Sequence, residues 1–82
     1  MNVEMILPEF RVEMGEAMDR LWDRFREGTL GAGQFLAARE RIYGSYLAAS
    51  VARAAGVGVR MLDPLTCRAE VTDVRRVAER MG

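Results

Sequence analysis

The sequence predicts an all-α domain, in which an antiparallel helical hairpin is followed by a third, shorter helix. Two observations support the hairpin: apolar residues recur at helical spacing over residues 8–27, and residues 34–57 are mostly apolar. A third observation supports the last helix, because a further helically spaced apolar stripe runs through 63–81. A chain of 82 residues is the size of one small domain, which we assign to residues 1–82.

The first helix is predicted over residues 8–27. Pro8 suits the first helical position, because the N–H that proline lacks would have no helical partner there. Gly28 is placed to end the helix as a left-handed cap. Residues 1–7 precede it as a lead-in, which either docks as an extended arm or frays. One face of the helix carries the apolar residues Phe10, Met14, Ala17, Leu21 and Phe25.

The second helix is predicted over residues 31–55, antiparallel to the first because the connection is so short. Gly31 is its expected N-cap, with Gln34 three residues on, and Thr29 is the alternative cap. Apolar residues lie on two sides of this helix. The first side holds Phe35, Ala38, Ile42, Ala49 and Ala52, and the second holds Leu36, Tyr43, Leu47, Val51 and Ala54. A helix that is apolar on two sides is expected to be covered on both, and the first helix covers only one.

The segment after Gly56 allows two interpretations. In one, Asp63 is an N-cap, Pro64 opens a third helix over 63–81, and Cys67 lies on its apolar seam. In the other, residues 57–71 alternate as a β-hairpin around Asp63 and Pro64, and a C-terminal helix covers 72–81, which makes the fold α+β. The helical seam accounts for more residues over a longer stretch, and it therefore favours the all-α fold.

Composition argues against catalysis and metal binding. All twelve basic residues are arginine, so the chain lacks histidine, the commonest general base and metal ligand. Cys67 is the only cysteine, and at a core-facing position we expect a small buried hydrophobe rather than a nucleophile. Residues 28–33 are glycine-rich but lack the lysine and preceding strand of a phosphate-binding loop. We therefore expect no enzyme activity, no cofactor and no metal.

One weak pattern concerns nucleic acid. Residues 51–57 (VARAAGV) look like the first helix and turn of a helix-turn-helix, and residues 72–82 (TDVRRVAERMG) are similar to a later helix of such repressor domains. The resemblance implies a recognition helix over roughly 58–67, but Asp63 and Pro64 fall in the middle of that range. The candidate nucleic-acid contacts are Arg53, Arg60, Arg68, Arg75 and Arg76.

The stronger prediction is a protein interface. Half of the residues are apolar, which is more than a domain this small easily hides. The candidate interface residues are large or flexible side chains, together with neighbours of a small-residue groove: Met14, Met18, Trp22, Tyr43, Gly44, Tyr46, Leu47 and Val51. We expect a non-enzymatic interaction module of a bacterial or phage accessory or structural protein. It self-associates or acts as a small subunit or inhibitor within a larger assembly, and a small DNA-binding regulator is the alternative.

Localisation is predicted to be cytoplasmic. Pro8 and Glu9 interrupt the first apolar run, and no basic region precedes it, so no signal peptide is expected. The nearest approach to a membrane span, from Ile42 to Ala52, is only about half as long as a bilayer requires. A single cysteine allows no internal disulfide, which agrees with a reducing compartment.

Overall fold

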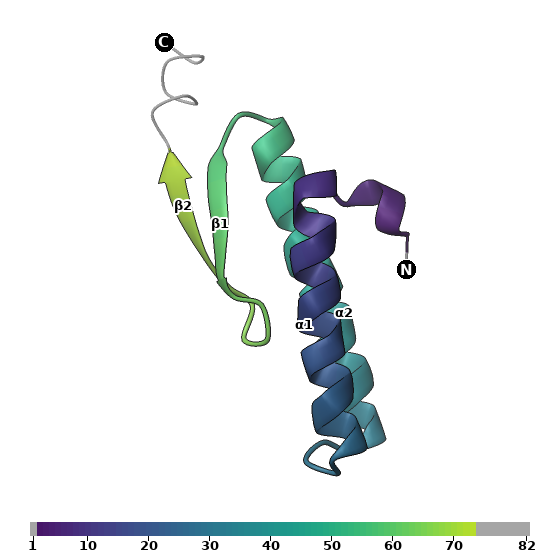
Figure 1. Cartoon of the computed structure of the whole chain (residues 1–82). Coiled ribbons are helices and arrows are strands. Elements are labelled where there is room, and N and C mark those ends of the chain that lie inside the picture. Colours follow the sequence, from purple (N-terminus) through teal and green to yellow (C-terminus); the bar gives the residue numbers. More distant parts are fainter. Residues whose placement is uncertain (1, 74–82) are drawn as a thin grey trace.

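Two antiparallel helices and a two-stranded sheet laid against the second helix make up the structure (Figure 1). The computed structural model describes residues 2–73. The elements in chain order are a short 3₁₀ helix η1 (Val3–Met5), α1 (Pro8–Arg26), α2 (Ala32–Ala54), β1 (Gly58–Asp63) and β2 (Arg68–Asp73). β1 packs on α2, on the side of the helix away from η1, and β2 pairs with β1.

The fold is therefore α+β, and the prediction of a third helix was wrong over residues 63–73. β1 and β2 pair antiparallel, with Val59 opposite Val71 and Met61 opposite Ala69. The alternative interpretation, a hairpin at 57–71, is close to the structure. Its C-terminal helix over 72–81 is not seen at 72 and 73, which continue β2, and residues 74–81 lie outside the described part of the chain.

The physical reason for the hairpin is the alternation in β1. Val59 and Met61 are buried, whereas Arg60 between them and Leu62 after them are exposed, and a helix would scatter these residues around its axis. Residues 64–67 make the turn. The Asp63 carboxylate accepts a hydrogen bond from the Leu65 N–H at 3.1 Å.

The ends of the helices follow the predicted local chemistry. Pro8 occupies the first helical turn, and Gly28 has a φ of 83°, in the left-handed region that favours glycine. Gly31 is the N-cap of α2, and its N–H donates to the Gln34 side-chain oxygen at 2.9 Å. Gly56, with a φ of 94°, follows α2 in the same way. The predicted bounds of both helices are confirmed to within one residue.

The core lies mainly between α1 and α2 and extends to the lead-in and to β1. Phe10 and Tyr46 meet edge to face with ring centroids 5.6 Å apart, and Ile42 is fully buried beside them. The complete set of buried apolar residues is Ile6, Phe10, Met14, Ala17, Leu21, Ala38, Ile42, Tyr46, Ala49, Val59 and Met61.

The lead-in docks against α2, as one of the two predicted outcomes. Ile6 is buried, and the Ser50 hydroxyl accepts from the Leu7 N–H at 3.1 Å while donating to the Tyr46 carbonyl at 2.7 Å. The Tyr43 hydroxyl donates to the Asn2 carbonyl at 2.8 Å. The arm includes a 3₁₀ turn and is not fully extended, because the Asn2 side chain caps that turn.

Candidate protein-interaction surface

The outer side of α2 carries apolar residues around one charged residue, Glu40, and the residues that the structure describes leave it uncovered. Leu36 is 55% exposed and Val51 is 63% exposed. Gly44 lies between them along the helix, and a Cβ added to it would meet open space. Leu47 is half-buried on the same side. We call Leu36, Gly44, Leu47 and Val51 the open face of α2.

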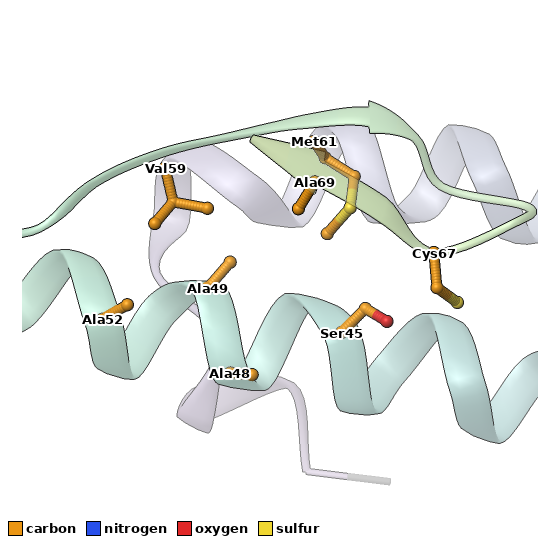
Figure 2. A pocket seen from close by; sticks show the side chains of 8 residues that line it. All are labelled: Ser45, Ala48, Ala49, Ala52, Val59, Met61, Cys67 and Ala69. Carbon is orange, nitrogen blue, oxygen red and sulfur yellow. The ribbon is translucent and has the colours of Figure 1, made fainter. Parts of the chain in front are cut away.

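This face corresponds to the second apolar side expected from the sequence. The hairpin lies over the neighbouring side of α2, where Ala49 and Ala52 face Val59 and Met61 (Figure 2). It does not cover Val51. In the described part of the chain, α1 and the β-hairpin therefore cover the other sides of α2 and leave the open face to solvent.

The other predicted interface residues fall into two groups. Met14 and Tyr46 are 4% and 0% exposed, so they belong to the core and have no surface to offer in this structure. Both lie on the inner seam of the helical hairpin, where large side chains fill the space between α1 and α2. Met18 and Tyr43 are half-buried at the edge of the core, and Trp22 is half-exposed.

Trp22 belongs to an aromatic cluster at the α1–α2 turn. Its ring centroid lies 5.7 Å from those of Phe25 and Phe35, which are themselves 4.7 Å apart. These contacts bridge the end of α1 and the start of α2, so they stabilise the helical hairpin. Trp22 is therefore already packed within its own chain, while its exposed half remains on the surface.

A second apolar feature is a concavity between α2 and the β-hairpin (Figure 2). Its volume is about 270 Å³, and small side chains line it. Figure 2 shows Ala48, Ala49 and Ala52 on the α2 side, with Val59, Met61 and Ala69 facing them from the strands. We call this the hairpin groove. It exists because the short side chains of α2 do not fill the space beneath β2.

Arg53 is held by three contacts within the chain. Its guanidinium pairs with the Glu9 carboxylate at 3.1 Å, lies 4.3 Å from the centre of the Phe10 ring, and donates to the Val59 carbonyl. It therefore joins the end of α2 to the start of α1 and to β1. The sequence assigned Arg53 to nucleic acid, and no local signal reveals these contacts between distant segments.

Among the described residues, the other arginines predicted to contact nucleic acid make no contacts that would bring them together in one patch. Arg60 pairs across the hairpin with Glu70 at 2.8 Å, and Arg68 is exposed on β2 opposite Asp63. Arg75 and Arg76 lie outside the described residues. The range expected for a recognition helix, 58–67, is instead a strand and a turn.

Two polar groups have perturbed titration. Burial, reinforced by the nearby Glu13 carboxylate, raises the pKa of Tyr46, and the Tyr46 hydroxyl has no hydrogen-bond partner in the described structure. The pKa of Asp63 is lowered, first by a hydrogen bond with Thr66 and also by the Arg68 charge. Packing in the core accounts for the first shift, and the geometry of the turn accounts for the second.

Cys67 lies in the turn and not in a helical seam. It is half-buried and has a φ of 60°, and its thiol contacts the Pro64 carbonyl at 3.6 Å. Within residues 2–73, no group of three acidic, cysteine or histidine side chains could hold a metal ion. In the same range, no helix is long and apolar enough to cross a membrane.

Comparison with known proteins finds no match for this chain among protein-family models, curated proteins or solved structures. The open face of α2 and the hairpin groove are apolar features that residues 2–73 leave open to another molecule.

Proposed function

We propose that this chain is a non-enzymatic protein-interaction module, which self-associates or serves as a small subunit or inhibitor within a larger assembly. The observation that supports this most is the open face of α2. Val51 and Leu36 are more than half exposed on one helix, with an uncovered glycine between them. An apolar helix face of this kind favours contact with another protein chain. The free Cys67 thiol suits a cytoplasmic setting.

The alternative of a DNA-binding regulator has less support. Arg53 and Arg60 have partners within the chain, which compete with phosphate for the guanidinium groups. A strand occupies the place of the expected recognition helix. No specific observation favours nucleic acid, so we propose the interaction module alone.

The experiment compares two glycine substitutions that have the same effect on a helix. Gly44→Leu and Gly15→Leu each add a side chain in open space, on α2 and α1 respectively. Each replacement is expected to stabilise its helix by about 0.5–1 kcal/mol, because glycine is a poor helix former. Only Gly44→Leu blocks close approach to the open face. We therefore expect it to reduce assembly, measured by light scattering and by co-purification from the native host, while Gly15→Leu leaves assembly unchanged.

A second pair of variants tests the same face through charge. Val51→Arg places a charge on the open face, and Val12→Arg places one on the exposed side of α1, where Val12 is 71% exposed. The proposal predicts that only the first weakens assembly, at an unchanged melting temperature. A parent chain that is monomeric and co-purifies with no partner would refute the proposal. If all four variants assemble equally, the open face of α2 is not the interaction surface.

A further inference from the structure

β2 presents a strand edge that has no partner among residues 2–73. It pairs with β1 on one side only, and every β2 residue from Arg68 to Val71 is exposed. Ala69 and Val71 lie on the same sheet face as the buried Met61 and Val59, but β1 makes the close contacts with α2, and Ala69 and Val71 remain exposed. An edge of this kind readily pairs with another strand, and two strands alone make a marginal sheet.

The outer face of the hairpin carries an alternating set of charges. Arg60 pairs with Glu70 at 2.8 Å, and Asp63 is opposite Arg68 in the strand register. Along β2, Arg68 and Glu70 are therefore two residues apart on one face and have opposite charge. A strand with this spacing is complementary to its own antiparallel copy, because residues directly opposite each other lie on the same face.

We propose that β2 pairs antiparallel with β2 of a second copy about a two-fold axis at Ala69, which gives a four-stranded sheet. In this register Arg68 is opposite Glu70 of the second copy, and the same pair recurs across the axis. Each cross-sheet row then reads Asp63, Arg68, second-copy Glu70, second-copy Arg60, and the charge alternates at every step. Each Glu70 carboxylate lies between two guanidinium groups.

Neighbouring registers are less favourable. An axis at Glu70 places the two Glu70 carboxylates opposite each other, which destabilises the pair. An axis at Val71 forms no arginine–glutamate pair. Charge complementarity therefore selects Ala69, whose small side chain also suits direct approach at the axis.

The inner face is consistent with the same arrangement. The row across the sheet would be Met61, Ala69 and their copies, all apolar, and Met61 is already buried against α2. The hairpin groove lies on this side, beneath Ala69 (Figure 2). Pairing extends the roof of the groove from two strands to four, so the exposed inner face of β2 gains neighbours. This surface differs from the open face of α2, and the two proposals therefore fail separately.

The test is a charge swap between copies, followed by analytical ultracentrifugation. Arg68→Glu alone places glutamate opposite Glu70, and Glu70→Arg alone places arginine opposite Arg68. We expect each variant to raise the dimer dissociation constant about tenfold or more. An equimolar mixture of the two restores both opposite-charge pairs between copies in a heterodimer, so we expect the mixture to dimerise about tenfold more tightly than either variant alone.

Arg39→Glu and Glu27→Arg are the matched controls, because they change the same charges at exposed positions away from the strands, on α2 and at the C-cap of α1. Circular dichroism checks that every variant keeps its helices. A monomeric parent would overturn the inference, as would single variants that dimerise like the parent or a mixture that stays monomeric. If the parent dimerises and only Gly44→Leu disrupts the dimer, the β2 inference fails while the proposed interaction module stands.

Discussion

Replacing Arg53 with methionine should destabilise the protein, because this side chain joins three segments. The substitution keeps a flexible chain of similar length over Phe10 and removes the charge and the donors. The ion pair with Glu9 contributes about 0.5 kcal/mol, because its two side chains are 36% and 51% exposed. The guanidinium over the Phe10 ring contributes about 0.5–1 kcal/mol. The hydrogen bond to the Val59 carbonyl contributes about 1 kcal/mol.

Together these contacts predict a loss of about 2 kcal/mol in the free energy of unfolding for Arg53→Met. In a chain of this length that lowers the melting temperature by about 10 °C. Chemical denaturation followed by circular dichroism measures the first quantity and thermal unfolding the second. Glu9→Gln removes the ion pair alone, so it should cost only about 0.5 kcal/mol. Arg39→Met, at an exposed position on α2, is the control for loss of an arginine.

Two results would refute this reasoning. If the free energy of unfolding of Arg53→Met is within about 0.5 kcal/mol of that of the parent, the contacts of Arg53 with α1 and β1 do not stabilise the fold. If Glu9→Gln costs as much as Arg53→Met, the exposed ion pair carries the whole effect. High salt should reduce the loss of stability caused by Glu9→Gln, while most of the difference in free energy of unfolding between Glu9→Gln and Arg53→Met should remain.

Two further predictions concern the core. Tyr46→Phe removes a buried hydroxyl that has no partner in the described structure, so stability near neutral pH should be unchanged or higher by up to about 1 kcal/mol in a denaturant titration. Because the folded pKa of Tyr46 lies above its ordinary value near 10, the parent should lose stability as pH rises above about 10. The Tyr46→Phe variant should lose less stability over the same pH range, and an equal loss would contradict the assignment of this pH dependence to Tyr46. Ser50→Ala leaves the Leu7 N–H without its acceptor, so unfolding should become easier by about 1–3 kcal/mol. Hydrogen exchange at Leu7 should also become faster, and unchanged exchange would show that Ile6 and the Tyr43–Asn2 hydrogen bond hold the lead-in without Ser50.

The helical hairpin could be predicted from sequence because its signals are local and agree with one another. Pro8, Gly28 and Gly31 each fix the backbone through their own geometry, and the apolar stripe of α1 has only one core-facing orientation. Residues 57–71 carry two patterns at once. The spacing of Cys67 and Val71 fits a helix, and the alternation from Val57 to Met61 fits a strand. A short apolar run does not decide between them, and contact of Val59 and Met61 with α2 does.

The candidate surface was predictable only in part. Two-sided apolarity in α2 indicated an open side, and Gly44, Leu47 and Val51 lie there. Residue type alone could not place Tyr46 and Met14, because the side chains enriched at interfaces are the same ones that fill a core. The free edge of β2 was missed for a different reason: it exists only once the hairpin replaces the predicted helix.

The order of packing has a consequence for local opening. α1 packs on α2, α2 packs on β1, and β1 pairs with β2, so each element depends mainly on the one before it. Opening of the hairpin leaves the helical pair largely intact but uncovers Val59 and Met61. β2, exposed from Arg68 to Val71, is therefore less protected than the helical pair, and its amides should exchange with solvent well before those in the middle of α2. A partner strand on β2 would raise local stability at this end of the order of packing.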